Sequence, residues 1–149
     1  MNRAQKRHEK KLARKAAKKG QLTKSTNRMA PEKMLSIDQQ TLTIEQAINT
    51  AVQHHTSGSL AQAKAIYQKI LDIEPQQPVA LHLIGVVAYQ SGENTKAVEL
   101  INRALSVAPD YADAHNNLGN AYRAMKKPNE AIESFQKAIV INPNYADAY

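Results

Sequence analysis

Residues 109–115 read Pro-Asp-Tyr-Ala-Asp-Ala-His, and residues 143–149 restate them as Pro-Asn-Tyr-Ala-Asp-Ala-Tyr. The same spacing of 34 separates Ala97 from Ala131. A fixed period of this length indicates a supersecondary unit that cannot bury its apolar face alone and is stabilised by stacking on its neighbours. The sequence therefore predicts a repeat protein whose function lies on an extended surface.

The composition favours a stack of helices and excludes several kinds of chemistry. The 149 residues include only 5 Gly and no Trp, and 42% of them are hydrophobic, which suits a helical solenoid. No Cys is present, so disulfides, thiolate zinc sites and cysteine nucleophiles are excluded. No stretch approaches the roughly 18 apolar residues of a membrane-spanning helix, and no apolar signal region opens the chain. We expect a soluble, cytoplasmic protein.

Positive charge is concentrated at the N-terminus. Residues 1–30 hold 11 of the 20 Lys and Arg and one acid, Glu9, so this segment alone carries +10. Residues 31–149 hold 9 basic and 12 acidic residues, a net charge of −3. We expect residues 1–30 to form a disordered or transiently helical tail that either solubilises the protein or binds nucleic acid or an anionic surface. The cations expected to bind such a polyanion are Arg3, Lys6, Arg7, Lys10, Lys11, Arg14, Lys15, Lys18 and Lys19.

Local signals divide the rest of the chain. Residues 31–43 are predicted to be a linker or an entry segment leading into the repeats, with a short helix as one form of the latter. The Thr43 to Gln46 stretch has the pattern of a helix capping box. The repeats are predicted at 44–77, 78–111 and 112–145, each with two helices separated by Gly, Ser or Pro breaks. Residues 146–149 open a fourth unit. We therefore expect a fragment of a longer array, the alternative being a natural C-terminus with a frayed end.

The third unit carries a family resemblance. It has Leu-Gly-x-x-Tyr at residues 118–122, Ala-x-x-x-Phe at residues 131–135, and then Pro143. This pattern resembles the tetratricopeptide repeat (TPR), with His115 in place of the usual Trp, and it is similar to the arrays of bacterial-type TPR proteins and protein O-GlcNAc transferases. The resemblance implies an all-α fold, a right-handed α-solenoid of helix-turn-helix units. Small residues such as Gly85 are expected to let the two helices of a unit approach closely.

Motifs of catalysis and of metal or cofactor binding are missing. The chain has no Gly-rich phosphate loop, no His-Glu-x-x-His helix and no Gly-x-Ser-x-Gly elbow, so we expect neither catalysis nor a cofactor. His54 and His55 would point about 100° apart on a helix, and no third ligand is near them in the pattern, so we expect no metal site. His115 is expected to pack in the core.

The resemblance implies a binding surface, because in TPR proteins the first helix of each unit lines a concave groove. The predicted groove residues are Ile48, Asn49, Val52, His55, His82, Val86, Tyr89, Asn116, Asn117, Asn120 and Arg123. An amide offers both a donor and an acceptor, so the asparagines can hold the backbone of an extended peptide. The carboxylate clamp that binds chaperone C-termini is not expected, because apolar or acidic residues such as Val52, Leu83 and Asp113 occupy its positions.

The sequence thus predicts a non-catalytic protein-interaction scaffold that binds an extended peptide in its groove. The first alternative is an N-terminal, substrate-recruiting TPR segment of a longer glycosyltransferase, similar to O-GlcNAc transferase. The second alternative is an RNA- or ribosome-associated protein, and it depends on the basic tail alone.

Overall fold

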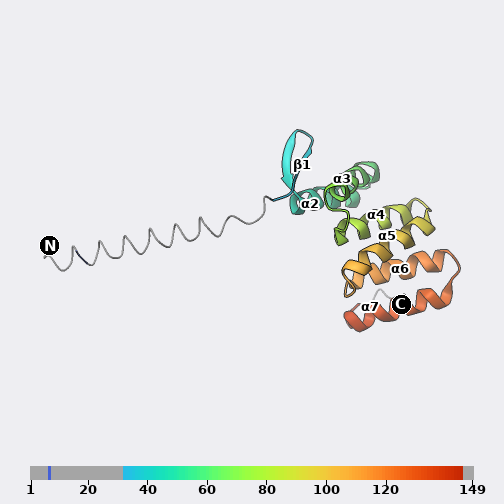
Figure 1. Cartoon of the computed structure of the whole chain (residues 1–149). Helices are drawn as coiled ribbons and strands as arrows, with labels where there is room; N and C mark the ends of the chain where they lie inside the picture. The colour runs from blue at the N-terminus through green and yellow to red at the C-terminus, as the bar shows by residue number, and fades with distance from the viewer. Residues whose placement is uncertain (1–6, 8–31, 146–149) are drawn as a thin grey trace. The chain divides into compact units, whose positions relative to one another are not determined.

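The computed structural model describes Arg7 and residues 32–145, and the chain divides into two units, Met1–Lys33 and Met34–Tyr149. Every helix and strand discussed below belongs to the second unit (Figure 1). Arg7 is exposed. The rest of the predicted basic tail, and residues 146–149 of the predicted fourth repeat, lie outside the described residues. Within the described part, no helix has the length and apolar character needed to cross a membrane.

Six helices form three consecutive pairs in residues 32–145. The pairs are α2 (Ile44–Thr56) with α3 (Leu60–Ile73), α4 (Pro78–Gln90) with α5 (Asn94–Val107), and α6 (Ala112–Ala124) with α7 (Pro128–Ile141). One pair falls within each predicted repeat unit. Neighbouring pairs contact each other through α3 with α4 and through α5 with α6, so the pairs stack in chain order (Figure 1). This arrangement confirms the predicted all-α, helix-turn-helix repeat fold.

The helix ends follow the local signals of the sequence. The Thr43 hydroxyl accepts from the Gln46 backbone N–H at 3.2 Å, and the Gln46 side chain accepts from the Thr43 N–H at 3.0 Å, which confirms the capping box. The turn inside each pair needs a left-handed residue, which is Gly58 (φ 82°) in the first unit and Gly92 (φ 80°) in the second. The third unit places Lys126 there at φ 58°, a conformation that costs about 1 kcal/mol for a residue with a Cβ.

Residues 34–43 of the predicted linker or entry segment form a β-hairpin, so the short helix considered for this segment is wrong. Strands β1 (Met34–Ile37) and β2 (Gln40–Thr43) pair antiparallel, and Asp38 and Gln39 between them both have positive φ, as a two-residue type I′ turn requires. The segment forms a strand because every second residue of β1 points to the same face, and that face is apolar. Leu35 and Ile37 are buried, and β1 contacts α2 and α3.

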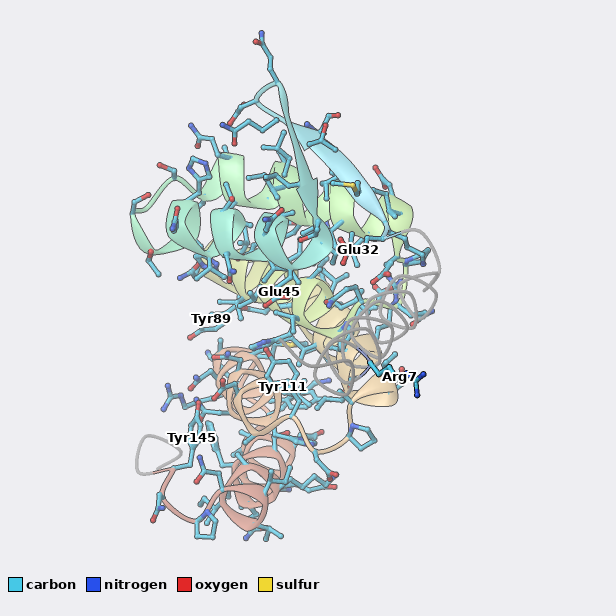
Figure 2. All side chains as sticks on the ribbon, turned by 90° about the vertical axis from the view of Figure 1, so that its left-hand side faces the viewer. Arg7, Glu32, Glu45, Tyr89, Tyr111 and Tyr145 are labelled. Carbon is cyan, nitrogen blue, oxygen red and sulfur yellow. The ribbon has the colours of Figure 1, made fainter. Side chains whose placement is uncertain are left out.

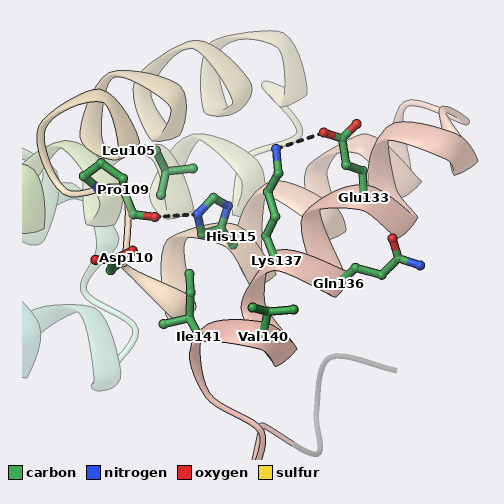
Figure 3. A pocket seen from close by; sticks show the side chains of 9 residues that line it. All are labelled: Leu105, Pro109, Asp110, His115, Glu133, Gln136, Lys137, Val140 and Ile141. Carbon is green, nitrogen blue, oxygen red and sulfur yellow. Dashed lines mark hydrogen bonds and ion pairs between the residues drawn. The ribbon is translucent and has the colours of Figure 1, made fainter.

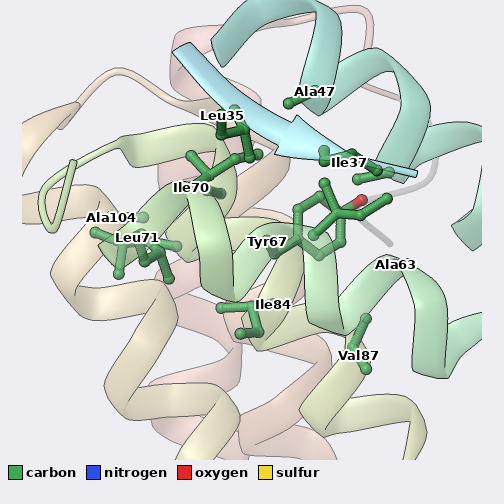
Figure 4. Close-up of a cluster of buried hydrophobic side chains, with 14 residues drawn as sticks. Leu35, Ile37, Ala47, Ala63, Tyr67, Ile70, Leu71, Ile84, Val87 and Ala104 are labelled. Carbon is green, nitrogen blue, oxygen red and sulfur yellow. The ribbon is translucent and has the colours of Figure 1, made fainter. Parts of the chain in front are cut away.

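The hairpin completes the core of the first helix pair. Leu35 and Ile37 belong to the same buried cluster as Tyr67 and Ile70 of α3 (Figure 4). Tyr67 and Ile70 are fully buried, at 0% exposure. The hairpin therefore covers apolar surface of α2 and α3 that would otherwise be open, on the side where no preceding helix pair is described.

Within a pair, small residues allow the helices to approach closely, as predicted. A Cβ added to Gly85 would lie 2.8 Å from Ile101 Cγ1, and one added to Gly119 would lie 2.5 Å from Phe135 Cε1. Both distances are shorter than a carbon–carbon contact allows. Glycine at these positions therefore lets a large side chain of the second helix rest directly on the backbone of the first.

Candidate functional site

The first helices of the three units share one side of the stack. Helices α4 and α6 contact each other directly, and Figure 2 labels Glu45, Tyr89, Tyr111 and Tyr145 among the side chains of the array. We call the exposed and half-buried side chains of α2, α4 and α6, together with half-buried Tyr111 directly before α6, the A-helix face. It contains the residues predicted to line the groove, except His82 and Asn116, which are buried.

The apolar part of the A-helix face lies on α2 and α4. Ile48 and Val52 on α2, and Val86 and Tyr89 on α4, are all half-buried. Ile48 packs against the core cluster of the first helix pair, and Tyr89 packs against the cluster that contains Ala97. These side chains contribute to the packing of the stack and still leave apolar surface open to a ligand.

His55 links α2 to its neighbours. Its Nε2 donates to Gln90 Oε1 on α4 at 2.7 Å, and its Nδ1 lies 3.4 Å from the Tyr67 hydroxyl on α3. Burial raises the pKa of Tyr67 to about 12, with an added effect of Tyr111, so this hydroxyl stays protonated. His55 is therefore held between two units of the stack.

His82 forms a second link, between α4 and the unit that follows. Its side chain is 3% exposed. Asn117 Nδ2 donates to His82 Nε2 at 2.8 Å, and His82 Nδ1 lies 2.9 Å from the Tyr111 hydroxyl. Burial lowers the pKa of His82 to about 4, against the opposing effect of Asp113 and with an added effect of His55. The imidazole is therefore neutral near pH 7.

Two tyrosines at equivalent repeat positions extend these contacts. Tyr111 bonds to His82 of the preceding first helix, and Tyr145, one repeat later, donates its hydroxyl to Asp113 Oδ1 at 2.7 Å. The pKa of Tyr111 is raised to about 12, mainly by burial and further by Asp113. Each hydroxyl therefore bonds to the first helix that precedes it in the chain.

The structure separates the predicted amides into three groups. Asn49 is exposed, whereas Asn117 and Asn120 are half-buried, and Asn120 Oδ1 accepts from the exposed Arg123 at 3.1 Å. Asn116 is buried, and its Oδ1 has no hydrogen-bond partner. Like His82, Asn116 therefore lies beneath the A-helix face rather than on its open surface, unlike the arrangement predicted for the groove.

Sequence reasoning did not predict the hydrogen bonds of these residues. Tyr111 was not among the predicted site residues, although it bonds to His82, and the bond between His55 and Gln90 was not predicted. A usable signal exists, because His55 to Gln90 and His82 to Asn117 are both separations of 35 residues. This spacing joins one position of a first helix to the next position in the following unit.

A pocket of about 550 Å³ lies away from these contacts, where α5, α6 and α7 meet (Figure 3). Leu105, Pro109 and Val140 are among its lining residues, together with His115. His115 is 8% exposed, and its Nε2 donates to the Pro109 carbonyl oxygen at 2.8 Å. The prediction of a packed histidine is confirmed, and a ring smaller than the Trp of the repeat pattern stands at this pocket.

His54 and His55 are the nearest approach to a metal site in the sequence. Within residues 32–145 and at Arg7, no group of three or more His, Cys, Asp or Glu side chains could hold a metal ion. His55 instead uses its ring nitrogens in the contacts with Gln90 and Tyr67.

Comparison with known families agrees with the repeat pattern. The tetratricopeptide repeat family matches residues 112–145, and a second family of TPR repeats matches residues 87–126. Residues 87–145 of the chain therefore carry tetratricopeptide repeats. The first match has the same bounds as the third predicted unit, and the two matches together cover the second half of the TPR array. Among curated proteins, no sequence matches the chain significantly.

Solved structures with the same fold are TPR proteins. The chain is similar to MamA (25% identity, TM-score 0.66), over 71% of this chain and 62% of that one. It is also similar to a variant of the O-GlcNAc transferase of Thermobaculum terrenum (30% identity, TM-score 0.69), over 70% of this chain and 20% of the transferase. A third similarity is to the first TPR domain of Spaghetti (RPAP3) bound to an HSP90 peptide. At 21% identity over 70% of this chain and 83% of that one, with a TM-score of 0.67, this last similarity establishes the fold alone.

The comparisons support a function for this chain at the level of its fold. TPR folds are generally non-catalytic modules for protein interaction, and this chain has such a fold. It spans less than two thirds of the MamA and transferase chains.

Proposed function

We propose that this TPR array is a non-catalytic scaffold that binds an extended peptide along its A-helix face. The observation that carries the proposal is the combination of surfaces on neighbouring helices. Half-buried Val86 and Tyr89 on α4 offer apolar contact, and half-buried Asn117 and Asn120 on α6 offer amide groups. The two helices are in contact and are joined by the bond between His82 and Asn117.

An extended peptide suits these surfaces for energetic reasons. Its backbone presents N–H and C=O groups at regular spacing, which amides can satisfy independently of sequence. Its side chains can bury apolar area against α2 and α4, at about 25 cal/mol per Å² removed from water. Amides desolvated without such partners would each cost about 1 to 3 kcal/mol, so a purely apolar ligand is disfavoured.

The expected ligand is not an acidic chaperone C-terminus. A carboxylate clamp requires cations and amides at fixed groove positions, and this chain has Val52, Leu83 and Asp113 among them. The peptide complex of the Spaghetti (RPAP3) domain therefore supports the use of this fold for peptide binding. The residues that this chain has at the clamp positions argue against binding of the same peptide.

The test begins with selection of peptides from a displayed random library against the full chain. The affinity of one selected peptide is then measured by fluorescence anisotropy for the wild type and for Asn49→Ala and Asn120→Ala, two changes on the A-helix face. Each should weaken binding about three- to tenfold, the cost of one hydrogen bond. Asn102→Ala, at an exposed position on α5, is the matched control and should leave binding unchanged. Equal losses for all three variants, or no selected peptide, would contradict the proposal.

Two other functions stay as predictions. The similarity to the transferase of Thermobaculum terrenum favours a substrate-recruiting role within a longer glycosyltransferase, and a catalytic domain encoded beyond Tyr149 in the same reading frame would support it. The charge of +10 on residues 1–30 favours binding of nucleic acid or another polyanion by the tail, with an affinity that falls steeply with salt.

A further inference from the structure

Three residues from two repeats form a connected set, which we call the His82 triad: Tyr111, His82 and Asn117. The two contacts of the ring measure 2.9 Å to the Tyr111 hydroxyl and 2.8 Å to Asn117 Nδ2. The rings of His82 and Tyr111 also pack edge to face, with centroids 4.7 Å apart. His82 is buried, and its two partners are half-buried on the A-helix face. The triad therefore connects an interior ring to two groups at the surface.

The positions of the protons follow from the chemistry of the three groups. A neutral imidazole has one N–H, and an amide nitrogen can only donate. Because Nε2 faces Asn117 Nδ2, Nε2 must accept and the ring proton must be on Nδ1. Nδ1 then donates to the Tyr111 oxygen. The Tyr111 proton is not used in this contact, and Asn117 Oδ1 accepts from no described residue.

We propose that His82 is a positioning residue that fixes a donor and an acceptor on the A-helix face for one stretch of peptide backbone. The donor is the Tyr111 hydroxyl, which bonds to a peptide C=O, and the acceptor is Asn117 Oδ1, which bonds to a peptide N–H. This inference rests on the proposed function of the A-helix face. It adds that recognition of the backbone is concentrated between the second and third units.

The opposite orientation of the triad would reverse what the ligand meets. With the ring proton on Nε2, Asn117 would turn its oxygen towards His82 and present its nitrogen, and Tyr111 would donate to Nδ1. Protonation of His82 would likewise turn Asn117, since both ring nitrogens would then donate. The charged or titratable groups that act on His82 are Asp113 from α6 and His55 from α2. Burial keeps the ring neutral near pH 7.

The direct test is the tautomer of His82 in the full chain, measured from the side-chain ¹⁵N shifts and long-range ¹H–¹⁵N couplings at pH 7. We expect a protonated Nδ1 and an unprotonated Nε2. This result would be informative, because free imidazole side chains prefer the proton on Nε2. A proton on Nε2, or an average of the two forms, would overturn the inference. The measurement requires no ligand, so it stands or fails separately from the proposed function.

A variant adds a second spectroscopic test. Asn117→Asp replaces the donor that faces Nε2 with a carboxylate oxygen, so His82 should move its proton to Nε2 or take up a second proton. Asn120→Asp is the matched control, because it adds the same charge on the same helix without a hydrogen bond to His82. The tautomer should change in the first variant alone. An unchanged tautomer in Asn117→Asp, with helicity retained by circular dichroism, would contradict the triad.

The final test uses a peptide selected as described above, with each backbone N–H methylated in turn. One methylated position should weaken binding to the wild type about tenfold and have little further effect on Asn117→Ala. Such coupling identifies the N–H that bonds to Asn117. If peptides bind but every methylated position affects wild type and Asn117→Ala equally, the proposed role of the triad in binding the peptide backbone is refuted. The peptide-binding function would then survive.

Discussion

The pH dependence of folding offers a quantitative test of the environment of His82. Its pKa is lowered from 6.5 to about 4, mainly by burial. Between these two pH values the unfolded chain binds more protons than the folded chain, so the stability of the fold rises with pH. The contribution of neutral His82 is fully present above pH 6.5 and is lost as the pH falls towards 4. A difference of about 2.5 pKa units, at about 1.4 kcal/mol each, amounts to about 3 kcal/mol.

The measurement compares urea unfolding of the wild type and of His82→Gln at about pH 7 and about pH 4.5. Gln keeps polar groups at the site and does not titrate. The free energy of unfolding of the wild type relative to the variant should fall by about 2 to 3 kcal/mol between the two conditions. Carboxylates titrate in both proteins, so their effects cancel in this difference. His54→Gln, which removes another imidazole from a first helix outside the triad, is the matched control.

The result that would refute the reasoning is a constant stability difference between wild type and His82→Gln across this pH range. It would mean that the pKa of His82 is the same in the folded chain as in the unfolded one. An equal pH dependence for His54→Gln would also count against it, because the effect would then not belong to the buried ring.

Two further predictions concern the packing that supports the A-helix face. Gly85→Ala should lower the melting temperature more than Gly119→Ala. The Cβ added at Gly85 would meet a buried isoleucine at 2.8 Å and a backbone oxygen at 3.3 Å, and neither can easily move. At Gly119 the three nearest atoms all belong to the ring of Phe135, which is half-buried and can shift. The reverse order would contradict this. Ile37→Ala in the hairpin should cost about 2 to 4 kcal/mol in urea unfolding, and Ser36→Ala, exposed on the same strand, less than about 0.5. Equal effects would show that the hairpin does not support the core.

The helices could be predicted because their signals are local and repeated. The repeat spacing, the capping box at Thr43 and the glycine turns at Gly58 and Gly92 each specify a helix boundary without reference to distant residues. The hairpin lacks such signals. Its strands are only four residues long, and its type I′ turn contains Asp38 and Gln39 instead of the Asn-Gly or Asp-Gly that usually marks this turn. What determines it is burial of Leu35 and Ile37 on α2 and α3, a tertiary effect.

The candidate site was harder to predict because its polar residues bond across repeats. Aligning the units position by position shows which residues share a face, and it placed His82 and Asn117 together on that face. It does not show that one is buried and bonds to the other, because the bond joins two different repeat positions 35 residues apart. Tyr111 lies just before α6, outside any first helix, so no face pattern includes it.

The two junctions of the array differ at these same positions, and the difference bears on what the face can recognise. Ile48 and Leu83, both half-buried and packed against the apolar core, occupy the first junction where His82 and Asn117 occupy the second. An apolar pair contributes contact area without direction, whereas a hydrogen-bonded pair fixes which atom faces the ligand. A peptide along the A-helix face would therefore gain affinity from side-chain burial at the first junction and register from its backbone at the second. Because an unmet hydrogen bond at the second junction costs more than a mismatched apolar contact at the first, the second junction should control the selectivity of this array.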